Sequence, residues 1–300
     1  MCEPGGADVS ATRVAVVQLR VRTNRAEDNI ARATAYIRAA KERGCRLVVL
    51  PEAFATGLDL PRSKSLAAQA PGPVVKQVAA LAAEERVHVA GGFLERDGEC
   101  VYSAAFVVDD RGELLHVHRR TNVYDLEGHF LSSGQASEVV DTAVGRLGFV
   151  IGYDVQFPET FRTLFAKRAE LILCPALLLR PFASSVALMI RARAAENCCY
   201  ILFASATGEN TIAGLTYMGH SAILQSPIGV RPYSNEFRKQ EPALAECSTE
   251  EGLLVADLDI VALRRLQRVN PLLRDFERSR FFDALTGECA GNSPPATGGG

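Results

Sequence analysis

Three short segments of the chain place a charged or conformationally special residue directly after an apolar run. In the first segment, Glu52 follows the apolar run at residues 46–50 and Pro51. The position just past the C-terminal end of a buried strand is where α/β proteins place their sites. A single carboxylate there is more often a solvated loop glutamate, so the interpretation of Glu52 depends on the other two segments.

The second segment, residues 118–123, contains the pair Arg119 and Arg120, and Glu127 follows soon after it. A guanidinium group is permanently charged, so it can stabilise an anion but cannot exchange a proton near neutral pH. It also fits a carboxylate through two parallel hydrogen bonds. Taken alone, a strand that ends in two arginines is usually the edge of a sheet at the surface.

The third segment, residues 148–159, is an apolar strand that turns sharply into a helix at Gly152. Glycine at such a turn supplies a backbone conformation that other residues resist. Because glycine has no side chain, it cannot attack a substrate. Tyr153 and Asp154 follow directly.

The apolar patterning around these segments predicts an α/β fold that positions them. Strands and helices alternate early in the chain, and a hairpin with turn residues at 109–113 follows. This mixture predicts a mixed sheet covered by helices. The predicted strands are residues 13–19, 46–50, 87–93, 102–108, 114–118, 146–151, 171–174, 199–205, 221–225 and 252–258, and the predicted helices are residues 28–43, 74–85, 158–166, 186–197 and 260–268.

The composition indicates a globular protein that binds neither nucleic acid nor a membrane. Of 300 residues, 48% are apolar, which is enough for a sizeable core. The 33 basic and 35 acidic residues are nearly balanced and do not run in blocks of one sign. We therefore expect the partner to be a small-molecule ligand or another protein.

Both ends of the chain are predicted to lie outside the folded domain. Residues 1–12 are polar and lack the basic flank and apolar run of a secretory signal. Residues 286–300 are rich in Gly, Pro and Ser and are predicted to be a disordered tail. The apolar run at residues 171–179 is too short to span a bilayer. We therefore predict one cytoplasmic domain at residues 13–285, with a disordered N-terminus at residues 1–12.

The eight cysteines are scattered, without metal-ligand spacing or a compact disulfide pattern. They are interpreted as reduced, mostly buried thiols, and neither a metal nor a cofactor is expected. Cys174, Cys198 and Cys199 lie in or beside apolar runs without an adjacent base, so they are interpreted as core residues and not as nucleophiles.

In their order and spacing, the three segments resemble the motifs of the nitrilase, or carbon–nitrogen hydrolase, superfamily. The Leu-Pro-Glu sequence that ends at Glu52 resembles the family's glutamate motif. Residues 118–123 align with its lysine motif, and residues 152–159 align with its cysteine motif and are most similar to the amidase-like branch. Supporting matches extend the resemblance over nearly the whole domain: residues 71–73, 91–95, 193–197 and 219–223.

The resemblance implies a four-layer αββα sandwich and a homodimer in which helices of two copies pack together. Residues 158–166 and 275–278 are the candidate dimer contacts. It also implies a chemistry in which a cysteine thiolate attacks an amide or nitrile carbon, a glutamate acts as general base and a lysine stabilises the oxyanion. In this alignment Glu52 retains the general base, and Glu127 matches a supporting glutamate.

The same alignment places Gly152 at the nucleophile and Arg120 at the lysine. Loss of the nucleophile costs a triad-type hydrolase on the order of 10⁶ in turnover, so the usual covalent hydrolysis is expected to be absent. His118 and Asn122 also depart from the motif, which has a tyrosine and a histidine there. We expect Arg120 to pair with Glu52 and thereby to lower the pKa of that carboxyl group.

Two functions remain open, and they differ in the role of Glu52. In the first, the protein is a pseudoenzyme that binds a small amide or carboxylate ligand, or a protein partner, over a floor of Glu52 and Arg120. Tyr153 and Asp154 are then expected close to the ligand. In the second, the space left by the missing cysteine admits a water molecule or a larger substrate group, and Glu52 activates the water or promotes a condensation or elimination. Hydrolysis by a displaced cysteine is a further alternative. The pocket walls are expected in residues 54–62, 126–133 and 180–185.

Overall fold

The computed structural model describes residues 11–227 and 241–279, which build two packed sheets. The first sheet consists of β1 (Ala11–Arg20), β2 (Leu47–Val49), β3 (His88–Asp97), β4 (Cys100–Val108), β5 (Leu114–Arg119) and β14 (Gly252–Asp259). Its strand order is β5-β4-β3-β2-β1-β14. The β1–β2 and β2–β3 pairs are parallel, and the outer pairs are antiparallel.

The second sheet consists of β6 (Val139–Thr142), β7 (Gly145–Phe149), β8 (Leu171–Ala176), β9 (Tyr200–Thr207), β12 (Ala222–Leu224) and β13 (Ala243–Glu246). β7, β8 and β9 are parallel neighbours, and the outer pairs are antiparallel. The two sheets join where the last residues of β1 pair with the end of β9. A small separate ribbon is formed by β10 (Glu209–Asn210) and β11 (Leu215–Thr216).

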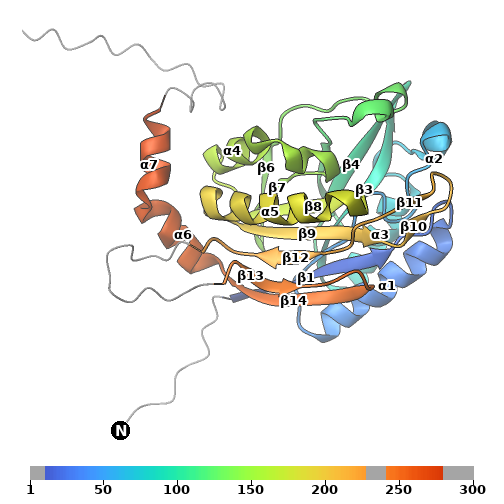
Figure 1. Cartoon of the computed structure of the whole chain (residues 1–300). Coiled ribbons are helices and arrows are strands. Elements are labelled where there is room, and N and C mark those ends of the chain that lie inside the picture. Colours follow the sequence, from blue (N-terminus) through green and yellow to red (C-terminus); the bar gives the residue numbers. More distant parts are fainter. Residues whose placement is uncertain (1–10, 228–240, 280–300) are drawn as a thin grey trace, which may run out of the picture.

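Helices cover the outer face of each sheet (Figure 1). The first sheet is covered by α1 (Ala26–Glu42) and α3 (Pro73–Glu85), and the second by α4 (Pro158–Ala166) and α5 (Ala183–Asn197). The other helices are α2 (Ser63–Leu66), α6 (Ile260–Val269) and α7 (Pro271–Glu277), with 3₁₀ turns η1 (Leu60–Arg62), η2 (Asp125–His129), η3 (Gly152–Gln156) and η4 (Arg180–Phe182). α1 buries Ala33, Ile37 and Ala40, which recur at helical spacing. Within the described residues, none of these helices has the length and apolarity needed to cross a membrane.

Alternation of side chains along the buried strands fills the three largest apolar cores of the described residues. Val14 and Val16 of β1 pack toward Phe149 of β7, in the core between the two sheets. Ala15 of β1 faces the other way, into the core under α1 and α3. Ile172 of β8 belongs to the core under α4 and α5. The layers therefore follow in the order helices, sheet, sheet, helices, which confirms the predicted αββα sandwich (Figure 1).

Most predicted elements are present, with ends that shift by a few residues, and the helix Pro158–Ala166 has the predicted bounds. The prediction that Ala11 and Thr12 are disordered is wrong, because they pair with Asp259 and Leu258 of β14. The prediction missed β6, β10, β11, β13, α2 and α7, which are too short to show a clear period. The predicted tail at residues 286–300 lies outside the described residues, as does the end of the predicted domain beyond residue 279.

The two segments named as candidate dimer contacts lie against each other within one chain. The rings of Phe165 in α4 and Phe276 in α7 are 5.6 Å apart between centroids. The guanidinium of Arg162 lies 5.0 Å from the Phe165 ring centroid and 5.2 Å from that of Phe276. These residues thus dock the C-terminal helix onto the second sheet's helical layer, and the homodimer stays a prediction.

Two histidines of β5 stack on a ring of the second sheet. His116 and His118 lie with their ring centroids 6.1 Å and 6.3 Å from that of Phe149. The hydroxyl of Ser137 donates to the Phe149 carbonyl at 3.0 Å and lies 3.2 Å from His118 Nε2. Burial, and then the nearby His116, lowers the pKa of His118 from 6.5 to about 4. The His118 imidazole is therefore neutral in the folded protein at neutral pH.

His118→Gln should remove part of the protein's sensitivity to acid. Below pH 6.5 the unfolded chain takes up a proton at His118, whereas the folded protein does so only near pH 4. The free energy of unfolding therefore falls by roughly 3 kcal/mol as the pH falls through this window, and this residue causes no further loss below it. Urea unfolding of both proteins between these pH values measures the difference. Parallel pH profiles would show that His118 titrates normally.

Candidate functional site

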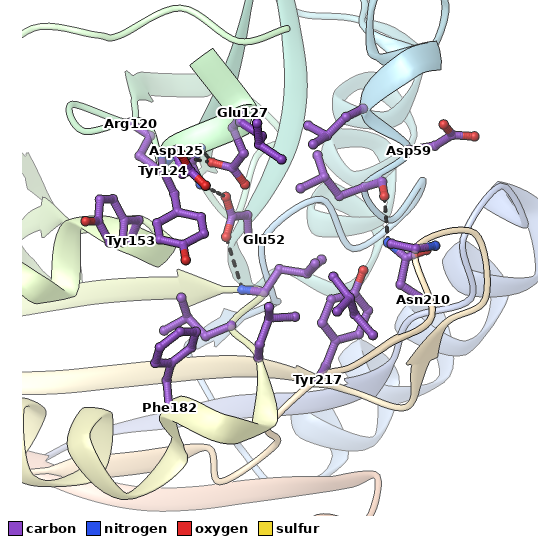
Figure 2. A pocket seen from close by; sticks show the side chains of 18 of the residues that line it. Glu52, Asp59, Arg120, Tyr124, Asp125, Glu127, Tyr153, Phe182, Asn210 and Tyr217 are labelled. Carbon is purple, nitrogen blue, oxygen red and sulfur yellow. Dashed lines mark hydrogen bonds and ion pairs between the residues drawn. The ribbon is translucent and has the colours of Figure 1, made fainter. Parts of the chain in front are cut away.

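Glu52 lies just past the C-terminal end of β2, and its carboxylate is buried with both oxygens bonded. Oε1 accepts hydrogen bonds from Ser103 Oγ at 2.6 Å and from Arg120 Nη1 at 3.0 Å. Oε2 accepts a hydrogen bond from the backbone N–H of Leu177 at 3.1 Å (Figure 2). The donors come from β4, from the end of β5 and from the segment after β8, so both sheets hold this one carboxylate.

Arg120 follows β5 directly and links Glu52 to Glu127. Its Nη1 donates to Glu52, and its Nη2 donates to Glu127, whose carboxylate also accepts the backbone N–H of Tyr124 at 3.2 Å. The Arg120 side chain is only 4% exposed. Burial acts to lower the pKa of Arg120, but Glu52, Glu127 and Asp154 together raise it, so the guanidinium remains charged. The predicted pairing of Arg120 with Glu52 is confirmed.

Asp154 is fully buried and fixes the segment that follows Arg120. Its Oδ1 accepts the backbone N–H and the side-chain Nδ2 of Asn122, both at 2.8 Å, and its Oδ2 accepts the N–H of Thr121 at 3.1 Å. Burial raises the pKa of Asp154, and the hydrogen bonds from Asn122 partly offset this. Asp154 does not line the cavity described below, and its contact with a ligand stays a prediction.

Gly152 begins η3 with φ +48°, in the left-handed region that favours glycine. A Cβ at this position would lie 3.0 Å from Glu52 Cδ and 3.2 Å from its Oε1, with Oε2 closer still. The carboxylate of Glu52 therefore occupies the space into which a side chain at position 152 would project. The expected room for a water molecule beside Gly152 is wrong, because the glutamate fills it.

The pKa of Glu52 moves in the direction opposite to the prediction. Burial raises it and has the largest effect, and the nearby Glu127 carboxylate adds to the rise. Arg120 and the Ser103 hydrogen bond lower it without reversing the sign. The prediction considered the ion pair alone, whereas removal of a carboxylate from water costs more than the pairing returns.

A cavity of about 670 Å³ opens beside Glu52 (Figure 2). Tyr153 lines it, as predicted, and its ring meets that of Tyr124 edge to face with centroids 4.9 Å apart. Arg120, Asp125 and Glu127 line the same cavity. Most of the wall is apolar and includes Leu58, Leu60, Leu177, Leu179, Phe182, Ile212 and Leu215.

The three predicted wall segments each contribute to this cavity, through residues 58–61, 126–127, and 182 and 185. The prediction missed a fourth wall, which comes from the β10–β11 ribbon and from Tyr217 after it. It also missed Leu177, which follows β8 directly and donates to Glu52. The sequence did predict the end of that strand, and neighbouring parallel strands end at the same edge of a sheet. The residues just after the strand could therefore have been expected near Glu52.

Within the residues that the structure describes, no cysteine lines the cavity. Cys174, Cys198 and Cys199 are buried, and burial raises the pKa of each thiol, which disfavours the reactive thiolate. Their interpretation as core residues is confirmed. No group of three or more His, Cys, Asp or Glu residues in the described ranges could hold a metal ion.

Both the sequence and the fold of the chain match one protein family. A model of the carbon-nitrogen hydrolase family matches residues 13–268, and the chain therefore belongs to this family. It is 30% identical over 277 residues to a nitrilase of Pyrococcus abyssi, covering 90% of this chain and 99% of the relative. It is 28% identical over 282 residues to an omega-amidase of Bos taurus, covering 90% and 96%. The fold matches that of a cysteine-to-alanine mutant of an amidase from Nesterenkonia AN1 with a TM-score of 0.73 at 24% identity, covering 90% and 98%.

Gly152→Ala should destabilise the protein more than an alanine at a comparable glycine elsewhere. The left-handed backbone costs about 1–2 kcal/mol in either case, and displacement of the Glu52 carboxylate adds about 1–3 kcal/mol at position 152. Gly98→Ala is the matched control, because Gly98 has φ +58° and open space around its Cβ position. Urea unfolding measures both. An equal loss for the two variants would mean that Glu52 moves away freely.

Arg120→Met should lower the free energy of unfolding by about 3–5 kcal/mol, because it leaves two carboxylates without their buried counter-charge. Glu52→Gln in the same chain should recover part of this loss, since one of those charges is then removed. Arg111→Met serves as control, because Arg111 bridges Asp109 and Glu113 at the surface and should change stability little. A similar loss in the two single variants would argue against a special role of the buried arginine.

Proposed function

We propose that this member of the carbon-nitrogen hydrolase family binds a small ligand in the cavity beside Glu52 and does not cleave it through a covalent acyl intermediate. The observation that carries the proposal is the geometry at Gly152. The family motif has its nucleophile at this turn, where the present chain has no side chain and the Glu52 carboxylate fills the space. The relatives are named as a nitrilase and an omega-amidase. A pocket inherited from such enzymes would once have bound nitriles or amides.

The surroundings of Glu52 and Arg120 support binding over proton transfer. A general base must direct a lone pair at the proton that it removes. Glu52 instead directs Oε1 at Ser103 and Arg120 and Oε2 at Leu177. Arg120 cannot exchange a proton at neutral pH, because a guanidinium keeps its charge. Both groups thus serve as fixed charges in the floor of the cavity.

A second candidate function is catalysis by Glu52 without a covalent intermediate. One observation favours it: burial raises the pKa of Glu52, which makes its carboxylate a stronger base. Glu52 also lines the cavity, so a substrate or a water molecule bound there would lie near it. In this function Glu52 would activate water, or promote a condensation or elimination on a bound substrate.

An amide hydrolysis assay separates the two functions. The wild-type protein is expected to release no ammonia from short aliphatic amides above the rate in buffer, because none of the cysteines in the described part of the chain lines the cavity. Intact-protein mass spectrometry after incubation is expected to show no acyl adduct. Calorimetry with the same amides measures binding in the wild type and in Glu52→Gln.

Ammonia release that disappears in Glu52→Gln, while binding persists, would favour catalysis by Glu52. An acyl group on one of the thiols during amide breakdown would contradict both functions, because it would reveal a displaced nucleophile. Equal loss of binding and turnover in Glu52→Gln would identify Glu52 as a structural carboxylate.

A further inference from the structure

We propose that the ligand of this cavity is an amphipathic cation, an apolar body that carries a protonated primary amine or an amidine. The inference rests on the proposed function, since it takes the cavity beside Glu52 as the ligand site. It goes beyond that function by assigning the charge of the head group. It also replaces the amide or carboxylate ligand expected from the sequence.

Carboxylates outnumber cations at the charged end of the cavity (Figure 2). Glu52, Asp125 and Glu127 line the cavity together with one cation, Arg120. Both hydrogen bonds to Glu127 go to its Oε2, so its Oε1 has no hydrogen-bond partner among the described residues. Asp125 is exposed, and its carboxylate likewise accepts no hydrogen bond within the described chain. Even with Glu52 protonated, two carboxylates face one guanidinium, so this end attracts a cation.

Arg120 cannot serve as the receptor for an anionic head group. Its Nη1 and Nη2 already hold Glu52 and Glu127, and its Nε is buried without a partner. The buried Nε is out of reach of an incoming carboxylate. Such a carboxylate would have to displace Glu52 or Glu127 from the terminal nitrogens, or remain unpaired beside these like charges. Like charges in close contact oppose binding, so the same arrangement that favours a cation rejects a carboxylate.

Aromatic rings border the charged end and add a second attraction for a cation. Tyr124 and Tyr153 both line the cavity and pack edge to face. The face of a tyrosine ring is negative and attracts an ammonium or amidinium group, most strongly where water is excluded. The two rings and the carboxylates of Asp125 and Glu127 thus offer the same head group complementary contacts.

The rest of the cavity fits an apolar body that reaches the mouth. Leu126 and Ile212 line the cavity although they are 64% and 59% exposed, and Leu215 and Phe182 are also exposed lining residues. Half of the exposed large apolar side chains of the described residues line this one cavity, and Tyr124 is among them. Exposed apolar groups gathered around an opening mark a binding site. They provide contact for a ligand's apolar chain.

Calorimetric titration with hexylammonium, hexanamide and hexanoate at neutral pH tests the head group, because the three probes share the same apolar chain length. Hexylammonium is expected to bind at least about tenfold more tightly than hexanamide, and hexanoate is expected not to bind. Higher salt should weaken the hexylammonium complex more than the hexanamide complex, because only the former depends on charge.

Asp125→Asn should reduce the preference for hexylammonium over hexanamide by about fivefold or more. The substitution keeps the local backbone, since Asp125 has φ +37° and asparagine tolerates this region. Glu127→Gln should have the same effect, with its fold checked by circular dichroism because Glu127 also holds Arg120. Asp110→Asn, at an exposed carboxylate in the β4–β5 turn, is the control and should leave the preference unchanged.

The outcomes distinguish this inference from the proposed function. Hexanamide or hexanoate binding as tightly as hexylammonium overturns the cationic head group and leaves ligand binding in place. An unchanged preference in Asp125→Asn and Glu127→Gln overturns it as well. Failure of all three probes to bind overturns both proposals. Ammonia release from hexanamide overturns the proposed function, while the order of the three affinities still decides the head group.

Discussion

The buried ion pair between Glu52 and Arg120 is the interaction on which the rest of the site depends. It joins the ends of two strands of the first sheet, and the Leu177 N–H adds the second sheet to the same carboxylate. A buried ion pair is costly to form, because both charges leave water, but once formed it is costly to break. The carboxylate and the guanidinium therefore have fixed positions, and the cavity forms around them.

This fixed carboxylate connects the residues of the three segments that the sequence analysis singled out. Glycine at position 152 leaves space, and Glu52 fills it. Arginine at position 120 has two terminal nitrogens, and it uses one for Glu52 and the other for Glu127. Asn122 bonds to Asp154 and holds the segment after the arginine. Each of these polar side chains thus has a partner in the structure, and together they form a bonded floor beside the cavity.

The cavity owes its shape to elements that are far apart in the chain. One end is charged because the segment after β5 and the η2 turn bring Arg120 and the nearby carboxylates together. The opposite wall is apolar because the β10–β11 ribbon and the end of β8 contribute leucine and isoleucine side chains. A pocket with one charged end and apolar walls selects its ligand by head-group charge first and by chain length second.

The sequence by itself determined most of the elements, because periods of two and of 3.6 residues record which face of each strand and helix is buried. The order of the layers followed from the resemblance of its motifs to a family and not from these periods. The sequence also determined that Glu52 follows a strand, that Gly152 occupies a turn and that Arg120 pairs with Glu52. Only the tertiary structure decided the direction of the Glu52 pKa, the filling of the space at Gly152, the role of Asp154 and the fourth wall of the cavity. These properties depend on burial and on contacts such as that between Glu52 and Leu177, which are 125 residues apart. Local patterns do not record such contacts, since desolvation of a group depends on everything that surrounds it in space.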